Sequence, residues 1–310
     1  MPEPRIISLI ASATEIVCAL GFRDQLVGRS HECDYPPDVD LLPVCSESRV
    51  DVHASSREID RQVKVAVAEA LSVYRVKVDE LKRLRPTHII TQTQCEVCAV
   101  SLRDVERAVC EMVGSQPEIV SLEPMCLADV WKDIHKVAAA LDAVPAGDQL
   151  VAQLQGRLDS VRQSVAGRIE TPTVLCLEWI DPLMVGGNWM PELVTIAGGH
   201  AVLATAGVHS PWISWEDLQH VDPDVIVVLP CGFDIPRSLA ELAAITDAPR
   251  WQSLRAVESK RVYVTDGNQY FNRPGPRVVE SAEILADVIH RPDTATRHRG
   301  TGWIPLPGSR

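Results

Sequence analysis

Short apolar runs alternate with segments of helical spacing along the first part of the chain. The runs at 5–10, 25–30, 87–92 and 118–124 have the length and composition of buried strands. Segments with apolar residues three and four apart lie between them, as expected for helices that connect parallel strands. The alternation therefore predicts an α/β lobe over residues 1–125.

The first helix carries start and stop signals in its sequence. Ser12, with Glu15 three residues later, has the spacing of a capping box, and Gly21 is a residue type that commonly ends helices. We therefore expect Ser12 to cap the helix and Gly21 to close it. Farther on, the helical spacing from 57 to 86 is interrupted by a short apolar stretch, which predicts a strand at 73–76.

A longer helical pattern begins at Leu127. It continues for roughly forty residues and has one break, at Val144 and Pro145, where a proline interrupts the spacing. This pattern predicts a linking helix over residues 126–170.

A second set of strands and helices follows the linking helix and predicts another α/β lobe over residues 171–292. Its strands are expected at 173–177, 224–229 and 261–265, and its helices at 190–197, 238–243 and 277–289. The remaining tail, 293–310, is rich in Pro, Gly and Arg, and we expect it to be loosely ordered. The predicted fold is two Rossmann-like α/β lobes joined by a long rigid helix, with the ligand in the cleft between the lobes.

Composition and charge exclude several classes of partner. A net charge of −12, with no cluster of basic residues, argues against binding to nucleic acid. No apolar run approaches the ~20 residues that a membrane-spanning helix needs, so no membrane insertion is expected. The first residues lack the pattern of a signal peptide, and nine cysteines without a regular spacing fit a reducing compartment. The sequence therefore predicts a cytoplasmic protein.

The pair Cys95-x-x-Cys98 directly follows a predicted strand, and His31 and Cys33 follow another. Thiolate and imidazole are ligands for zinc and similar metals, so these four residues would form a metal site if the two loops meet. They would equally serve as buried small side chains or as direct ligand contacts. Because the lobe has a core of its own, we expect Cys95 and Cys98 to be reduced thiols without a structural metal.

Aromatic and amide side chains gather at the expected strand ends. The chain has seven Trp against three Phe, and Trp179 and Trp189 flank a Gly-Gly-Asn turn at a strand end. A tryptophan offers a broad flat face and one N–H donor, which suits a large ligand. The common catalytic motifs, such as G-x-S-x-G, the P-loop and H-E-x-x-H, are missing. We therefore expect no enzyme and assign no catalytic residue.

Several segments, in order along almost the whole chain, resemble one family. RIISLIASATEIVCALG, VGRSHECDYPP, DPDVIVV and YFNRPGPRVVESAEILADVIHR are similar to the vitamin B12 (cobalamin)-binding members of the periplasmic binding proteins that serve ABC importers. HECDYP, CEVCA and RPGPR resemble a cytoplasmic subgroup of these proteins that lacks an export signal. The resemblance implies that Tyr35 contacts the corrin ring and that the loop from Gln269 to Arg273 contacts its other side.

The function that the resemblance implies is the binding of cobalamin or a related corrinoid, as a carrier, a sensor or an uptake protein. Partners would be the corrinoid and an ABC importer or another corrinoid-handling protein. A corrin is a flat macrocycle edged with amides, so it needs aromatic faces and neutral hydrogen-bonding groups. The candidate ligand-binding residues are His31, Cys33, Tyr35, Gln92, Cys95, Cys98, Trp179, Asn188, Trp189, Phe233, Gln269, Tyr270, Phe271, Asn272 and Arg273.

Two alternatives stay open at this point. The first is a metal, haem or iron–sulfur protein that uses His31, Cys33, Cys95 and Cys98 as ligands. The second is a cysteine-dependent enzyme that acts on a corrinoid, with a histidine brought next to the cysteine by the fold.

Overall fold

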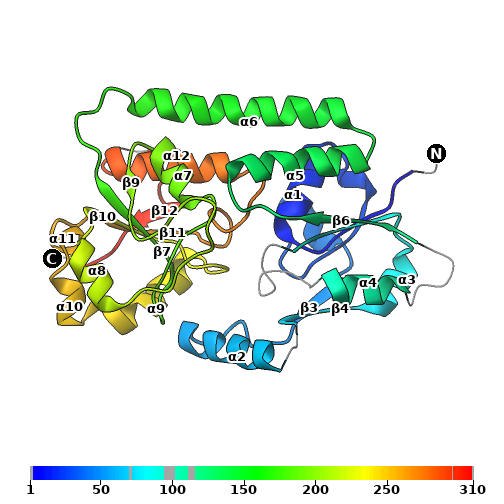
Figure 1. Ribbon diagram of the computed structural model, residues 1–310, viewed down its shortest axis with the longest axis horizontal. Helices are drawn as coiled ribbons and strands as arrows, with labels where there is room; N and C mark the ends of the chain where they lie inside the picture. The colour runs from blue at the N-terminus through cyan, green and yellow to red at the C-terminus, as the bar shows by residue number, and fades with distance from the viewer. Residues whose placement is uncertain (1–2, 70–71, 94–101, 111–115, 295, 309–310) are drawn as a thin grey trace. The chain divides into compact units, whose positions relative to one another are not determined.

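The computed structural model describes residues 3–69, 72–93, 102–110, 116–294 and 296–308. The chain divides into two compact units, each containing a sheet with helices around it (Figure 1). Unit 1 comprises Met1–Ala54, Glu58–Pro124 and Ala128–Gln153, and unit 2 comprises Ser55–Arg57, Met125–Leu127 and Leu154–Arg310. The predicted two-lobe α/β fold is confirmed.

Unit 1 contains a four-stranded parallel sheet in the order β2-β1-β5-β6. Its strands are β1 (Ile6–Ser8), β2 (Leu26–Arg29), β5 (His88–Gln92) and β6 (Glu118–Leu122). Their side chains are almost fully buried in β1 and β5, as the apolar runs predicted. A separate antiparallel pair, β3 (Ser46–Ser48) and β4 (Tyr74–Val76), includes the predicted short strand.

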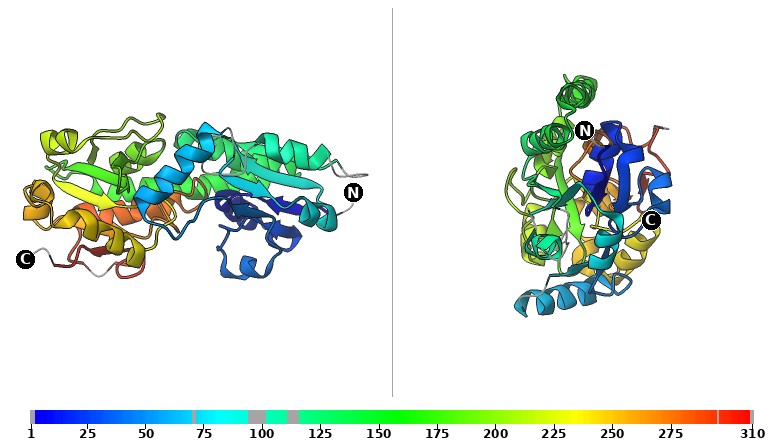
Figure 2. Two further views of the ribbon diagram at one scale, coloured as in Figure 1. Left: turned by 90° about the horizontal axis from the view of Figure 1, so that it is seen from below. Right: turned by 90° about the vertical axis from the view of Figure 1, so that its right-hand side faces the viewer.

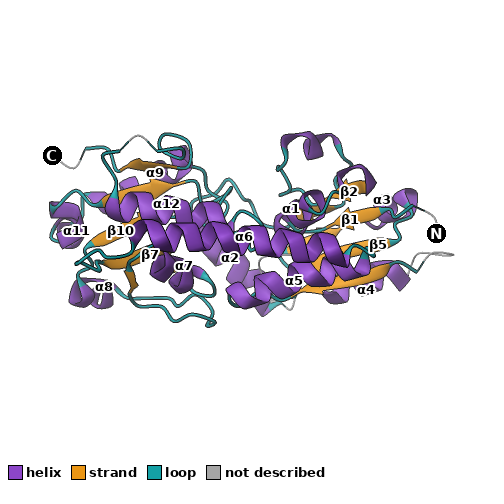
Figure 3. Ribbon diagram, turned by 90° about the horizontal axis from the view of Figure 1, so that it is seen from above, coloured by secondary structure: helices purple, strands orange, loops and turns teal. Residues whose placement is uncertain are grey.

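Helices connect these strands, as Figure 3 shows in purple. The helices that begin before residue 145 are α1 (Ala11–Ala19), α2 (Ser56–Ala68), α3 (Val78–Leu84), α4 (Leu102–Cys110), α5 (Leu127–Ala140) and α6 (Val144–Val165), with short 3-10 turns η1 (Arg23–Gln25) and η2 (Pro37–Leu41). All four strands of the sheet are parallel, so their carboxyl ends lie at one edge.

The start of α1 differs from the prediction. Ile10 is the N-cap residue, no side chain caps the helix, and Ser12 lies buried inside the first turn. The connection from β1 to α1 is so short that the helix begins one residue before the serine that was expected to cap it. The predicted capping box is therefore wrong. Gly21 does close the helix: it has a left-handed φ of 89° and its N–H bonds to the Cys18 carbonyl at 3.0 Å.

The break in the linking region also lies elsewhere. Two helices, α5 and α6, are separated at 141–143, where Asp142 has a left-handed φ of 54°. Pro145 lies in the first turn of α6, where a missing N–H costs nothing. The proline therefore begins a helix rather than interrupting one.

Unit 2 contains a larger, mixed sheet in the order β12-β11-β10-β7-β8, with β9 also paired to β7. Figure 2 shows the strands of both units from two further directions. The central strands β7 (Thr173–Trp179), β10 (Val225–Val228) and β11 (Val262–Thr265) are parallel, and β8 (Met184–Val185) and β12 (Trp303–Pro305) are antiparallel to their neighbours. The remaining elements are β9 (His200–Ala201), α7 (Met190–Ile196), α8 (Trp215–Val221), α9 (Ile235–Thr246), α10 (Pro249–Gln252), α11 (Arg255–Glu258) and α12 (Val278–His290).

Within residues 296–308 the C-terminal tail is not loosely ordered, contrary to the prediction. Its strand β12 pairs with β11, so that Thr265 lies opposite Trp303. The Trp303 side chain has 0% exposure and meets the Tyr263 ring edge to face, with centroids 5.6 Å apart. The segment Trp303–Pro305 is short and contains a proline, so it gave no strand signal in the sequence. The buried Trp303 side chain nevertheless holds it against the sheet.

Two glycines give a matched test of packing in unit 1 and in α6. A methyl group on Gly28 would lie 2.7 Å from Cys45 Sγ and 2.9 Å from Leu84 Cδ1, both in the core. We expect Gly28→Ala to lower the free energy of unfolding by about 1–3 kcal/mol, because this core has no room for a methyl group. Gly156 in α6 has no atom within 4 Å of its added methyl, so Gly156→Ala should raise stability by up to ~1 kcal/mol.

Urea unfolding of the two variants, followed by circular dichroism, measures both changes. Equal stabilities for Gly28→Ala and the parent protein would show that the core around β2 yields to an added methyl group.

Candidate ligand-binding site

The loops that leave the parallel strands carry most of the candidate residues. In unit 1 these loops begin after Arg29 of β2 and after Gln92 of β5. In unit 2 they follow the ends of β7, β10 and β11. Open α/β sheets bind ligands beyond the carboxyl ends of their strands. Each unit, taken by itself, therefore has a candidate site at this edge.

The first loop of unit 1 is held in shape by Arg29, a residue that the sequence did not single out. Its Nη1 donates to the carbonyl oxygens of Ser30 at 3.1 Å and Cys33 at 3.0 Å. Its Nη2 donates to the Asp40 carbonyl at 3.2 Å and forms an ion pair with the Asp40 carboxylate at 3.1 Å. Tyr35, at the end of this loop, is 41% exposed, which is high for a large aromatic side chain. The loop therefore presents Tyr35 on a fixed backbone.

His31 contacts two residues from the antiparallel pair β3 and β4: Ser46, by a hydrogen bond, and Tyr74, by ring packing. Its Nδ1 lies 2.9 Å from Ser46 Oγ, and its ring lies 5.2 Å from the Tyr74 ring, tilted by 47°. The Tyr74 hydroxyl donates to Glu32 at 2.9 Å, which holds the next residue of the loop. Ser46 and Tyr74 are far from His31 in sequence, and no local pattern marked them.

The charge state of His31 follows from its surroundings. Burial, with the positive charges of Lys77 and Arg29 acting in the same direction, lowers its pKa to about 4. The imidazole is therefore neutral at pH 7. No hydrogen bond from any described residue reaches its Nε2.

The cysteines of the predicted metal site are only partly within the described residues. Cys33 is buried and accepts a hydrogen bond from Thr14 Oγ1 at 2.9 Å. Gln92 is buried at the end of β5. Cys95 and Cys98 lie outside the described residues. Within the described ranges, no three His, Cys, Asp or Glu side chains gather in a way that would hold a metal ion.

In unit 2 the candidate aromatic residues are largely enclosed. Trp179 is 9% exposed and packs against Phe233, with ring centroids 5.2 Å apart. The guanidinium of Arg237 lies 3.7 Å from the centroid of the Phe233 ring. Trp189 is 7% exposed and donates its N–H to the Phe271 carbonyl at 3.0 Å. Only narrow parts of these indoles reach the surface, and their contact with a ligand stays a prediction.

Asn188 occupies a tight turn between these tryptophans. It has a left-handed φ of 50°, its N–H bonds to the Val208 carbonyl at 2.7 Å, and its own carbonyl accepts from Gly207 at 2.9 Å. A side chain on Gly187 would lie 2.5 Å from the Val208 oxygen, so this turn requires glycine. The Asn188 Oδ1 atom is buried and receives no hydrogen bond from the described residues. An unpaired buried acceptor is costly and is a natural partner for an N–H donor.

The side chains of the loop from 266 to 273 differ in how far they are buried. Asn272 points inward, where its Nδ2 donates to the carbonyls of Leu229 at 3.0 Å and Gly267 at 2.9 Å. Arg273 is buried and donates to Asn268 Oδ1 at 3.2 Å, and Phe271 is buried as well. In the same loop, Gln269 is exposed and Tyr270 is half-buried.

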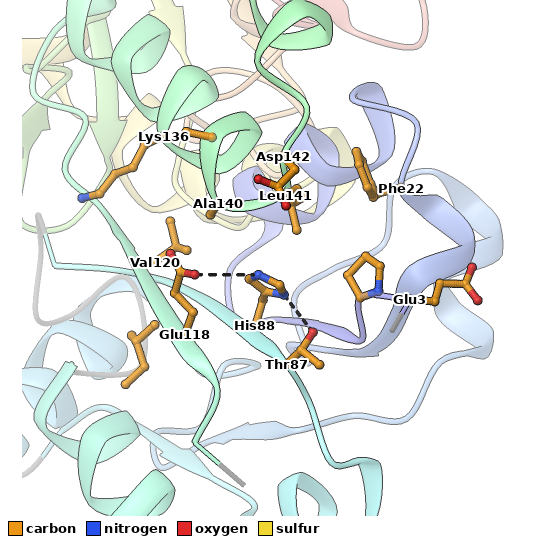
Figure 4. Close-up of a pocket in the computed structure, with 13 residues that line it drawn as sticks. Glu3, Phe22, Thr87, His88, Glu118, Val120, Lys136, Ala140, Leu141 and Asp142 are labelled. Carbon is orange, nitrogen blue, oxygen red and sulfur yellow. Dashed lines mark hydrogen bonds and ion pairs between the residues drawn. The ribbon is translucent and has the colours of Figure 1, made fainter. Parts of the chain in front are cut away.

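The sequence missed a cavity in unit 1, at the opposite edge of the sheet (Figure 4). It has a volume of about 860 Å³ and is lined by the first residues of β5 and β6 and the last turn of α5, including His88, Glu118 and Asp142. His88 lies at its centre, 3.9 Å from the Glu118 carboxylate. Since these are the amino ends of the strands, the cavity does not belong to the candidate site.

Two α/β units with polar and aromatic loops at the carboxyl edges of their sheets define a two-lobed ligand-binding protein. The chain belongs to the periplasmic binding protein family, whose model matches residues 6–269. It is 25% identical over 300 residues to the uncharacterized ABC transporter substrate-binding lipoprotein YvrC of Bacillus subtilis, covering 94% of this chain and 82% of that protein.

Other relatives point to more than one ligand within the family. The chain is 22% identical over 301 residues to the vitamin B12-binding protein of Vibrio cholerae, covering 93% of this chain and 90% of that protein. In structure it is similar to the periplasmic heme-binding protein RhuT from Roseiflexus sp. RS-1, with a TM-score of 0.68 and 22% identity over 92% of this chain and 97% of that one.

Family membership decides two of the predictions. The family consists of substrate-binding proteins of ABC transporters, which catalyse no reaction, so the expectation that the chain is not an enzyme is confirmed. The predicted cytoplasmic location is wrong, because the relatives are periplasmic proteins or lipoproteins. The prediction rested on the first residues and on the number of cysteines. Both are weaker evidence for location than the similarity to periplasmic proteins and lipoproteins. Throughout the described residues, every helix is too short or too polar to cross a bilayer.

His31 yields a prediction about proton binding. Its C–H resonances in an NMR titration should move with a midpoint near pH 4, assigned by their loss in His31→Gln. Lys77→Gln should raise this midpoint, because it removes a positive charge that disfavours the imidazolium ion. Lys132→Gln, on α5, is the control, since Lys132 is not among the charges that act on His31.

The same shift has a consequence for stability. Between the ordinary pKa of 6.5 and about pH 4 the unfolded chain binds a proton at His31 and the folded chain does not. The free energy of unfolding should therefore fall as the pH drops through this window, and less steeply in His31→Gln. A midpoint near 6.5 in the folded protein would contradict the buried environment described above.

Proposed function

We propose that the chain binds a corrinoid, cobalamin or a close relative of it, as the ligand-binding component of an ABC importer. The importer role is supported by the relationship to a substrate-binding lipoprotein, and the ligand by the relationship to a vitamin B12-binding protein. The relative with a similar structure that binds heme makes the choice of ligand the main question.

The observation that favours a corrinoid is that the arginines Arg29 and Arg273 of the candidate loops are engaged within the protein. Haem carries two propionate carboxylates, which call for cationic partners, whereas a corrin is edged with neutral amides. At the carboxyl edge of unit 1, the Arg29 guanidinium is already bonded to two carbonyls of its own loop and to Asp40. In unit 2, Arg273 is buried and bonded to Asn268.

These loops also offer neutral groups. His31 is an uncharged imidazole, Tyr35 is an exposed aromatic side chain, and Gln269 is an exposed amide. Asn188 adds a buried acceptor that the described residues leave unpaired. Aromatic faces and amide partners match the flat ring and amide rim of a corrin better than the charged edge of haem.

Titration calorimetry with hydroxocobalamin, cyanocobalamin and hemin tests the ligand. We expect one cobalamin per chain, with a Kd in the micromolar range or below, and weaker binding of hemin. Binding of hemin without measurable binding of either cobalamin would overturn the corrinoid assignment and leave a haem carrier in its place.

A pair of exposed residues tests the role of Tyr35. Tyr35→Ala should weaken cobalamin binding about tenfold, because it removes an aromatic face worth about 1.5 kcal/mol, and should leave thermal stability unchanged. Leu41→Ala is the control: Leu41 lies in the same connection, in η2, and is 89% exposed, so its loss should change neither quantity. Equal affinities for the Tyr35→Ala variant and the parent protein would remove Tyr35 from the site.

A further inference from the structure

We propose that the C-terminal segment 296–308 positions the ligand loop 266–273 of unit 2, and that His298 does so by holding the ring of Tyr270. An effect on ligand binding rests on the proposed function, whereas an effect on the loop does not. The segment lies beyond the residues that match the family model, which end at 269.

The backbone of the segment is joined directly to the first residue of the loop. Strand β12 pairs with β11, and the Asp266 N–H continues this ladder by donating to the Gly302 carbonyl at 3.0 Å. The N–H groups of Gly302 and Trp303 in turn bond to the His298 carbonyl at 2.7 and 3.1 Å. The position of His298 is therefore fixed relative to the start of the ligand loop.

The side chain of His298 reaches from this anchor to Tyr270. The two rings meet edge to face, with centroids 5.9 Å apart and planes at 77°. His298 is 5% exposed, and its Nε2 lies 3.0 Å from a Glu283 carboxylate oxygen, which sets the ring orientation. Glu283 also accepts a hydrogen bond from Arg157 of α6 at 2.7 Å, so its own position is fixed. An edge-to-face contact of this kind stabilises one orientation of the half-buried Tyr270 ring.

Arg277 completes the support of the same loop. Its guanidinium lies 5.4 Å from the centroid of the Tyr270 ring, and its Nη1 donates to Gln269 Oε1 at 3.3 Å. Gln269 and Tyr270 are thus both held by groups outside the loop. His298 itself is too enclosed to offer a ligand much surface, so its effect on binding would pass through Tyr270.

Two substitutions separate the ring contact from the bond to Glu283. His298→Phe keeps an aromatic ring next to Tyr270, and His298→Gln keeps a donor for Glu283. We expect His298→Gln to weaken hydroxocobalamin binding about five- to tenfold and His298→Phe to restore it to within about twofold of the parent protein. Arg299→Ala is the control. Arg299 lies in the same segment, and its guanidinium lies 5.5 Å from the centroid of the Trp303 ring. The substitution therefore removes a contact with Trp303 and leaves the contact between His298 and Tyr270 in place.

A double-mutant cycle distinguishes positioning from general damage. If His298 acts through Tyr270, the loss caused by His298→Gln should disappear in a chain that already carries Tyr270→Ala. Hydrogen exchange of the amides at 266–273, measured without ligand, should be faster in His298→Gln than in His298→Phe and the Arg299→Ala control.

Hydrogen exchange of the loop tests the positioning role, and cobalamin binding by the parent protein tests the proposed ligand. Fully additive losses in the cycle, or unchanged exchange of the loop in His298→Gln, would overturn the positioning role. If the parent protein binds no cobalamin, the proposed ligand is wrong, and the exchange measurement alone decides whether the segment positions the loop. Faster exchange confined to the loop in His298→Gln supports the inference in either case.

Discussion

A loop that leaves a parallel strand takes its backbone carbonyls away from the sheet, and those carbonyls need donors before the loop can hold one shape. In this protein, side chains supply them. The guanidinium of Arg29 bonds to two carbonyls of the loop that carries His31 and Tyr35. The amide of Asn272 does the same in unit 2 for the carbonyls of Leu229 and Gly267, at the starts of the loops after β10 and β11. The surfaces offered to a ligand depend on these donors.

This use of donors also decides the electrostatic character of the site. A guanidinium that is bonded to its own backbone has less capacity left for an anionic ligand, and a histidine in a partly buried position between positive groups does not become a cation at pH 7. At the carboxyl edges of the two sheets, the cations Arg29 and Arg273 are thus engaged within the protein, and His31 adds no positive charge at pH 7.

Periodicity and apolar runs were sufficient to predict the two lobes, because buried strands such as β1 and β5 have paired isoleucines at their start or centre, Ile6 and Ile7 in β1 and Ile89 and Ile90 in β5. Local signals were less reliable where the tertiary structure competes with them. Ser12 has the right spacing for a cap, but the short turn after β1 places it inside the helix. The supports of the candidate site, Ser46 and His298, lie far along the chain from His31 and Tyr270, so no local pattern connects them.

The strand β12 has a further consequence for how this protein behaves at high concentration. An uncovered edge of a sheet offers a row of N–H and C=O groups to other chains, and this is a common route to aggregation. In unit 2 the edge of β11 is covered by a strand of three residues that ends at Pro305, which has no N–H to donate. A strand of three residues that ends in a proline is a poor template for another chain. The same segment that we propose to support the ligand loop therefore also protects the sheet from edge-to-edge association.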